Sequence, residues 1–283
     1  MKIGLIGTGQ MGAAIGARLV GEGCSVISPL AGRSTASRAR ASVAGIEPCG
    51  ADDLAGTAII LSILPSSAAP DVIGDLRPLL TGVGGPVFIE ANALSPDAKR
   101  DLLSPLLAAG ARVVDASIIG APPGPGGKGP RIYACGDHAA AVMALRDHGL
   151  DIRLIDAPIG AAAALKLSYA ALNKGMTALV TASLLMAEAS GTLDALLAEW
   201  AISQPGLLER SRGSVPSMYP KARRWVSEFE EIAAFATRNH AGGAVFAAIA
   251  EFYAARAEAY EMSGEAGRLA TALGVSGSEV RST

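Results

Sequence analysis

A glycine-rich turn close to the start of the chain has the spacing of a phosphate-binding loop. Gly7, Gly9 and Gly12 directly follow the apolar run 3–6 and precede a segment with helical periodicity. In a Gly-x-Gly-x-x-Gly pattern the first glycine permits a tight turn, the second lets the backbone approach a pyrophosphate, and the third lets the helix pack closely on the strand. The N–H groups at the start of the helix then face the anion. We therefore predict a dinucleotide site formed by Gly7, Thr8, Gly9, Gln10, Met11 and Gly12.

The stretch after the next expected strand indicates which dinucleotide is bound. In proteins that bind NAD, an acidic residue about 20 positions further on binds the ribose 2′-hydroxyl. No Asp or Glu occurs between Gly23 and Ile46. Arg33 and Ser34 lie there instead, and a guanidinium with a hydroxyl suits the 2′-phosphate of NADP. We therefore predict NADP (NADPH) as the cofactor, with NAD less favoured, and we interpret Arg40 as part of a solvated basic helix face.

The elements that must position this turn alternate between short apolar runs and helix-like segments. The strands are apolar on both faces, as the run 58–64 shows, which is typical of a parallel sheet covered by helices on both sides. Ser95 and Pro96 indicate a helix start, as the N-cap and the first helical residue. The predicted fold class is α/β, a Rossmann-type doubly wound parallel sheet that binds ligands at the carboxyl ends of its strands. Strands are expected at 3–6, 25–27, 58–64, 87–90 and 111–115, and helices at 11–20 and 95–109.

The second part of the chain is poor in glycine, and its patterns are helical. Most of the 34 glycines precede residue 161. We therefore expect an NADP-binding Rossmann domain at 1–160 and an all-helical substrate and dimerisation domain at 161–283, which begins with a long interdomain helix. The long helix is too apolar for the remaining residues to cover. Alanine-rich helix faces allow helices to approach closely, so we expect a homodimer. Helices are expected at 161–190, 193–202, 222–239, 244–261 and 265–273.

Composition and motifs argue against several other classes of protein. The formal net charge is −2, so no nucleic-acid partner is expected. The three histidines have no cysteine partners or His-Glu-x-x-His motif, so no metal site is expected. The three cysteines are widely spaced, and an apolar strand begins at once, so a cytoplasmic location is expected. The apolar stretch 158–190 contains Lys166 and Lys174; we interpret it as a buried helix and expect no membrane partner.

Five stretches in sequence order resemble the β-hydroxyacid dehydrogenase superfamily, which includes 3-hydroxyisobutyrate dehydrogenase and 6-phosphogluconate dehydrogenase. The glycine turn is similar to the superfamily's opening motif, including Met11. Residues 160–166 resemble the segment that carries its catalytic lysine, although Ala170 stands where the superfamily has asparagine. The second half resembles the helical C-terminal domain of a poorly characterised branch. The five stretches are 4–12, 63–65, 90–96, 115–120 and 160–166.

The resemblance implies roles for residues at two strand ends. Leu64 and Pro65 would lie along the cofactor, and Asn92 would lie near the nicotinamide ribose and the reacting carbon. A turn former before Ser95 is the competing interpretation of Asn92. The substrate-recognition segment would continue into the Gly/Pro-rich loop 120–129, which either presents N–H groups to a carboxylate or is a flexible surface connection. Its predicted substrate-binding residues are Ser117, Ile118 and Gly120.

Lys166 is the predicted catalytic acid and base. It is one of six lysines and lies in the apolar run 161–167. Burial lowers the pKa of a lysine toward neutrality, which suits proton exchange with the oxygen of an alcohol or carbonyl. A side chain that reaches water along an apolar stripe is the competing interpretation. On a helix, Asn173 lies within about 20° of Lys166 and roughly 10.5 Å along the axis, so we expect it to contact substrate.

Together these residues predict an NADP-dependent oxidoreductase that acts on CH–OH groups. It would interconvert a small hydroxyacid-type alcohol and its carbonyl by hydride transfer, with Lys166 exchanging the proton and Asn92 and Ser117 holding the substrate. Two alternatives stay open. The first is an imine reductase, because the asparagine after Lys166 is missing, and the second is a non-catalytic NADP(H)-binding protein.

Overall fold

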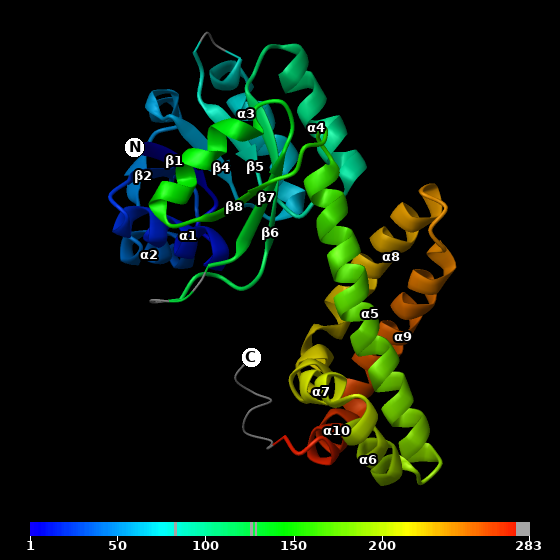
Figure 1. Ribbon diagram of the computed structural model, residues 1–283. Coiled ribbons are helices and arrows are strands. Elements are labelled where there is room, and N and C mark those ends of the chain that lie inside the picture. The colour runs from blue at the N-terminus through cyan, green and yellow to red at the C-terminus, as the bar shows by residue number, and fades with distance from the viewer. Residues whose placement is uncertain (82–83, 125–126, 128, 276–283) are drawn as a thin grey trace. The chain divides into compact units, whose positions relative to one another are not determined.

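Eight strands form one sheet in the first part of the chain (Figure 1). The computed structural model describes residues 1–81, 84–124, 127 and 129–275. The strands are β1 (Lys2–Ile6), β2 (Ser25–Pro29), β3 (Glu47–Cys49), β4 (Ile59–Ser62), β5 (Val87–Glu90), β6 (Val113–Ile119), β7 (Arg131–Cys135) and β8 (Asp151–Leu154). Their order is β3-β2-β1-β4-β5-β6-β7-β8, and only β6 and β7 pair antiparallel among these described strands. The order reverses between β1 and β4, which confirms the predicted doubly wound fold class.

Alternate strand residues face two separate apolar clusters, one on each face of the sheet. On β4, Ile59 and Leu61 belong to one cluster and Ile60 to the other, and each is at most 3% exposed. The period of two explains why both faces of the strand are apolar. The helices α1 (Gln10–Gly21) and α2 (Thr35–Val43) contribute to the first cluster, and α3 (Ala69–Leu80) and α4 (Pro96–Ala108) contribute to the second.

Strand β6 is longer than the sequence patterns predict. It continues past Asp115 to Ile119, and all seven of its residues are buried. The sequence patterns predict that this strand ends at residue 115, and that end is wrong, because Ser117 and Ile118 both pair with β7, a strand that the patterns did not predict. Pairing with β5 on one side and β7 on the other keeps the segment extended. The loop begins at Gly120, which has a φ of +125°.

The chain divides into two compact units, Met1–Lys166 and Leu167–Thr283. The division falls inside the helix α5 (Ala161–Ala189), whereas the expected domain boundary lay at its start. By length and composition alone, α5 is long and apolar enough to cross a membrane. However, 44% of its most apolar stretch is buried inside the protein. The core helix of a globular domain has the same composition.

The described part of the second unit consists of helices that pack around aromatic side chains. The rings of Trp225 and Phe229 lie 5.2 and 5.4 Å from the ring of Tyr253, measured between centroids. Figure 1 shows the two helices that carry them side by side. One helix, Pro205–Met218, was not predicted, because its glycines and Pro216 disfavour a helix interior. The helices are α6 (Leu193–Ser203), α7 (Pro205–Met218), α8 (Ala222–Arg238), α9 (Gly243–Met262) and α10 (Glu265–Ala272).

Candidate functional site

The glycine turn between β1 and α1 is closed by protein atoms at two positions and open at the third. Gly7 has a φ of +98°, and a Cβ there would lie 2.1 Å from the carbonyl oxygen of Ile63. A Cβ on Gly12 would lie 1.9 Å from the carbonyl oxygen of Gly7. A Cβ on Gly9 would meet no atom within 4 Å. The protein's own packing thus requires Gly7 and Gly12, whereas Gly9 leaves a cradle beside the helix.

The first turn of α1 suits an anion in this cradle. The helix begins at Gln10 with Gly9 as its N-cap, and no side chain caps it. Its first N–H groups and the positive end of its dipole therefore face the space beside Gly9, which fits a pyrophosphate. Gln10 is exposed, and Met11 packs against the core. Thr8 is only 4% exposed and donates a hydrogen bond to the carbonyl of Ser37 at 3.0 Å.

The two residues predicted to bind a 2′-phosphate lie at the start of α2. Ser34 is the N-cap of this helix, and its hydroxyl accepts a hydrogen bond from the N–H of Ser37 at 3.2 Å. Arg33 is half-buried. Its guanidinium has no hydrogen bond or ion pair with the residues that the structure describes. Among the residues that the structure describes, Arg33 is thus a cation without a counter-charge, next to a helix N-terminus.

Arg40 is not part of a solvated helix face, so its interpretation is corrected. It is half-buried, and its Nε donates a hydrogen bond to the carbonyl of Thr8 at 3.0 Å. A second guanidinium nitrogen donates to the Ser37 hydroxyl at 3.2 Å. Arg40 therefore ties α2 to the glycine turn. Its side chain reaches the glycine turn rather than bulk solvent, which a basic composition alone does not reveal.

Asn92 lies at the carboxyl end of the sheet and is 2% exposed. Its Oδ1 accepts a hydrogen bond from the Leu64 N–H, and its Nδ2 donates to the Ser62 hydroxyl at 3.3 Å. The structure thus brings together Leu64 and Asn92, two residues predicted to lie near the cofactor. Pro65, the next residue, is exposed. Because both polar atoms of the Asn92 amide are bonded to the protein, Asn92 also shapes the turn.

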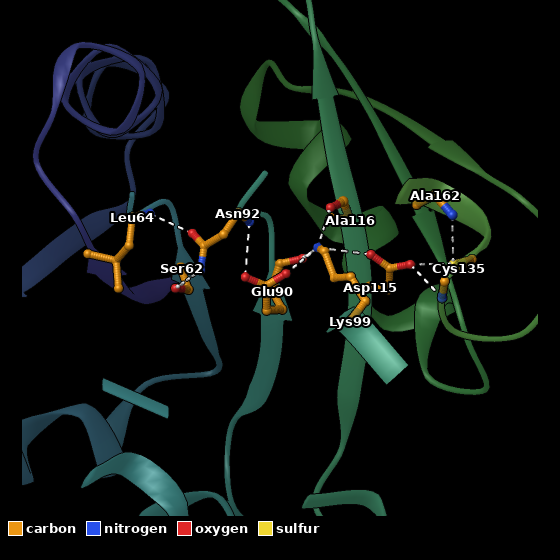
Figure 2. A network of polar contacts seen from close by, with 10 residues as sticks. Ser62, Leu64, Glu90, Asn92, Lys99, Asp115, Ala116, Cys135 and Ala162 are labelled. Atoms are coloured by element: carbon orange, nitrogen blue, oxygen red, sulfur yellow. Dashed lines mark hydrogen bonds and ion pairs between the residues drawn. The ribbon is translucent and has the colours of Figure 1, made fainter. Parts of the chain in front are cut away.

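A row of polar residues crosses four neighbouring strands at this edge (Figure 2). The strand register places Ser62 opposite Glu90, Glu90 opposite Asp115, and Asp115 opposite Cys135. Lys99 of α4 lies between Glu90 and Asp115 and forms ion pairs with both. Lys99, Glu90 and Asp115 are each 0% exposed. The sheet edge therefore contains a fully buried ion triad.

Burial shifts the pKa of one member of the triad, Glu90, and of its neighbour Cys135. Burial raises the pKa of the Glu90 carboxyl, although the nearby charge of Lys99 acts in the opposite direction. Burial also raises the pKa of the Cys135 thiol to about 11, and the charge of Asp115 adds to this effect. Cys135 is therefore an un-ionised hydrogen-bonding group at neutral pH, and it is not a nucleophile.

Sequence reasoning missed Lys99, although a signal for it exists. Lys99, Leu103 and Leu106 are spaced three and four residues apart, so the lysine lies on the apolar stripe of its helix. Glu90 and Asp115 each follow a run of apolar strand residues. A lysine on the buried stripe of a helix, together with acidic residues that follow apolar strand residues, predicts a buried ion pair.

The predicted substrate-binding residues of β6 are less accessible than expected. Ser117 is 1% exposed and Ile118 is 7% exposed, while Gly120 is exposed. In the loop 120–129, residues 125, 126 and 128 lie outside the described residues. The substrate-binding roles of Ser117, Ile118 and Gly120 stay predictions.

Lys166 is half-buried near the start of α5 and is the last residue of the first compact unit. The start of this helix is fixed by hydrogen bonds from its backbone N–H groups. The Gly160 N–H donates to Asp115 at 2.8 Å, and the Ala162 N–H donates to the Cys135 sulfur at 3.3 Å. These bonds connect the helix that carries Lys166 to the polar row. The catalytic role of Lys166 stays a prediction.

Asn173 belongs to the second compact unit. Its Nδ2 donates to the Tyr169 carbonyl at 2.8 Å, and its Oδ1 accepts a hydrogen bond from Arg210. The next residue, Lys174, forms an ion pair with Glu228 and lies 5.0 Å from the centroid of the Trp225 ring. Burial lowers the pKa of Lys174, although Glu228 opposes the shift. The substrate contact expected of Asn173 stays a prediction.

Comparison with protein families identifies two segments of the chain. Residues 2–147 match the family described as the NAD-binding domain of 6-phosphogluconate dehydrogenase. Residues 187–255 match a domain described only as a domain of unknown function. A search of curated protein sequences finds no match.

Among the described residues, no group of three or more His, Cys, Asp or Glu side chains is placed to hold a metal ion.

Solved structures with the same fold cover almost the whole chain. A conserved protein described as structurally similar to 3-hydroxyacid dehydrogenases has a TM-score of 0.78 and 24% identity, over 92% of this chain and 98% of its own. Mycobacterium tuberculosis 3-hydroxyisobutyrate dehydrogenase, solved with L-serine, has a TM-score of 0.71 and 17% identity, with coverages of 95% and 98%. The imine reductase from Myxococcus stipitatus, in complex with NADP+, has a TM-score of 0.55 and 17% identity, with coverages of 93% and 95%.

Two glycine substitutions separate folding from dinucleotide binding. We expect Gly12→Ala to lower the thermal unfolding midpoint, because its Cβ would overlap the Gly7 carbonyl, and overpacking costs about 1–3 kcal/mol. We expect Gly9→Ala to leave the midpoint unchanged, because its Cβ meets open space. It should weaken dinucleotide binding at least about tenfold, because the methyl group occupies the cradle. Calorimetry and fluorescence titration measure the two effects, and unchanged dinucleotide affinity of Gly9→Ala would contradict the assignment.

Proposed function

Because the chain belongs to the family of the NAD-binding domain of 6-phosphogluconate dehydrogenase, we propose that it is an NADP-dependent oxidoreductase. It interconverts a small hydroxyacid-type alcohol and its carbonyl. The observation that carries the proposal is the open cradle at Gly9, in front of a helix without a side-chain cap. That cradle suits the pyrophosphate of a nicotinamide dinucleotide. The substrate class follows from the superfamily resemblance of the segments 90–96 and 160–166.

In this proposal the bound nicotinamide would supply or accept the hydride. The residues of this chain would bind the cofactor, exchange the proton and orient the substrate. The turn Gly7–Gly12 would hold the pyrophosphate, and Leu64 and Pro65 at the end of β4 would lie along the cofactor. Lys166 exchanges a proton with the substrate oxygen. Asn92 and Ser117 would hold the substrate in one orientation.

Substitution of Lys166 tests its proton transfer. We expect Lys166→Ala to lower kcat roughly a hundredfold or more, because general acid–base catalysis contributes about 10²–10⁴-fold. The Kd for NADPH should stay within about twofold, because phosphate binding lies elsewhere in the proposal. Lys2→Ala removes an exposed lysine and is the control for the change of charge. An unchanged kcat of Lys166→Ala would reject the catalytic role.

The preference for NADP rests on Arg33. This guanidinium has no counter-charge among the described residues and lies beside the N-cap Ser34, at the start of α2. The helix N-terminus and the cation both favour a phosphate dianion. An acidic residue at this place would repel the 2′-phosphate, and none occurs between Gly23 and Ile46.

Substitution of Arg33 tests this preference. We expect Arg33→Ala to weaken NADPH binding about tenfold or more, because a charge-assisted hydrogen bond is lost. NADH binding should change by less than about twofold, since NADH has no 2′-phosphate. Arg77→Ala removes an exposed arginine from the last turn of α3 and should leave both affinities unchanged. Fluorescence titration measures them, and tighter binding of NADH than NADPH by the unmodified protein would overturn the preference.

Imine reduction is the second candidate function. The observation that favours it is Ala170, a buried residue where the superfamily has asparagine. Loss of that amide alters the polar groups available to a substrate oxygen. NADPH oxidation with short oxoacids, aldehydes and cyclic imines distinguishes the candidates, together with NADP+ reduction by hydroxyacids. Turnover of cyclic imines alone would favour the second candidate, and binding without any turnover would indicate a non-catalytic NADP(H)-binding protein.

We propose that the protein forms a homodimer through its second unit. A groove of about 390 Å³ lies between α5, α8 and α9 and is lined by small residues such as Ala171, Gly175 and Ala236. Leu172 and Leu179, also in its lining, are 63% and 64% exposed. Small and protruding apolar residues on one face suit a self-complementary interface with a second copy.

The free thiols of the three cysteines are compatible with the reducing cytoplasm, where we place the protein.

Light scattering tests the dimer. At micromolar concentration we expect the mass of two chains, because exposed apolar area of this kind is unfavourable in water. Leu172→Glu with Leu179→Glu should shift the mass to one chain without lowering helix content, since both side chains face outward. Val43→Glu changes an exposed apolar residue of the first unit and should leave the dimer intact. A mass of one chain for the unmodified protein would contradict the proposed dimer.

A further inference from the structure

Lys99 is completely enclosed by the first unit, and the proposed reaction does not use it. Its Nζ donates hydrogen bonds to the carbonyl oxygens of Glu90, at 2.7 Å, and Ala116, at 2.9 Å. It also pairs with the Glu90 carboxylate and, at 3.0 Å, with Asp115 Oδ1. The N–H bonds of the ammonium are therefore satisfied inside the protein. Because Lys99 is 0% exposed, it touches neither substrate nor cofactor.

Each carboxylate of the triad uses one oxygen for Lys99 and the other for a functional segment. Glu90 Oε1 accepts a hydrogen bond from the Asn92 N–H at 3.1 Å. Asp115 Oδ2 accepts a hydrogen bond from the Gly160 N–H at 2.8 Å. Figure 2 shows Lys99 between these two branches. One branch ends at the turn that carries Asn92, and the other ends at the start of α5, six residues before Lys166.

The second branch has a further contact through a thiol. Cys135 donates a hydrogen bond to Asp115 Oδ2 at 3.3 Å, and its sulfur accepts one from the Ala162 N–H at 3.3 Å. The first turn of α5 is thus held at both Gly160 and Ala162. Both contacts depend on the orientation of the Asp115 carboxylate, and Lys99 fixes that orientation by binding the other oxygen.

Stability alone does not account for the triad. Apolar side chains of similar volume are often as stabilising as a buried ion triad, because desolvation of the charges offsets their attraction. Loss of the ammonium alone would leave Glu90 and Asp115 on neighbouring strands without a counter-charge, so both carboxylates would turn away or take up protons. Either response changes the acceptors of the Asn92 and Gly160 N–H groups.

We propose that Lys99 is a positioning residue that sets the geometry between Asn92 and Lys166. A single buried ammonium orients two carboxylates, and these fix the Asn92 turn and the first turn of α5. The inference deepens the proposed oxidoreductase function and rests on the roles given there to Asn92 and Lys166. All residues of this arrangement belong to the unit Met1–Lys166.

Replacement of Lys99 by methionine removes the ammonium and keeps the length of the side chain. We expect kcat to fall at least about tenfold, because misplacement of a catalytic group by about 1 Å costs up to roughly a hundredfold. The Kd for NADPH should stay within about twofold, because the contacts of Lys99 are on β5 and β6. Assays are made well below the unfolding midpoint of each variant. A wild-type kcat in folded Lys99→Met would overturn the proposal.

Leu103→Ala is the matched control for loss of stability. Leu103 lies one turn from Lys99 on α4 and is also 0% exposed, but it contacts neither branch through a polar atom. We expect this variant to unfold at lower temperature and to keep kcat within about twofold, since a cavity leaves the carboxylates paired. An equal fall in kcat for Leu103→Ala and Lys99→Met would overturn the proposal.

The combined variant Glu90→Gln, Lys99→Met and Asp115→Asn keeps the test decisive if Lys99→Met does not fold. It contains no unpaired buried charge, so we expect it to fold. We expect its kcat to stay at least about tenfold below that of the unmodified protein, because the ammonium that orients both side chains is missing. Recovery of the full kcat would overturn the proposal.

Amide hydrogen exchange separates this inference from the proposed function. In Lys99→Met, or in the combined variant, we expect the amides of Asn92, Gly160 and Ala162 to exchange at least about tenfold faster. The amide of Ile60 in β4 should keep its rate. This readout does not need turnover, so an inactive wild-type protein would refute the proposed function and leave the Lys99 test standing. Unchanged exchange at all three amides would overturn the positioning role.

Discussion

The carboxyl edge of the sheet depends on one buried ammonium. An unpaired charge inside a protein costs several kcal/mol, so Lys99 requires that Glu90 and Asp115 both face α4. The strand register meets this requirement by placing the two carboxylates opposite each other on β5 and β6. Their remaining oxygens then hold the Asn92 turn and the start of α5. A local electrostatic requirement is thus transmitted to two segments that are distant in sequence.

The glycine turn is a second constraint, of a different kind. Steric contact closes Gly7 and Gly12 against backbone carbonyls, and this contact presents the N-terminus of α1 at the open position Gly9. Arg40 braces the same turn through the Thr8 carbonyl. Backbone packing therefore shapes the phosphate cradle near β1, whereas buried charge shapes the edge near β5 and β6. The hydrogen bond between Leu64 and Asn92 joins the two regions.

Features that depend on local sequence were predictable, and features that depend on strand register were not. The doubly wound sheet and the helix start at Ser95 follow from periodicity and capping, and the structure has both. The length of β6 depends on pairing with β7, which no local pattern near Ser117 indicates. The role of Lys99 depends on Glu90 and Asp115 meeting across two strands. Its position on an apolar stripe was visible in the sequence, but its partners were not.

Nitrogen-15 NMR of the lysine side chains tests the central claim most directly. The account predicts that the Lys99 ammonium protons exchange slowly with water, because every N–H bond is buried and hydrogen-bonded. Their resonance should show contacts to Glu90 and Asp115 at neutral pH. The exposed Lys2 should exchange too fast to give such a signal. Exchange of the Lys99 protons as fast as those of Lys2 would contradict the account.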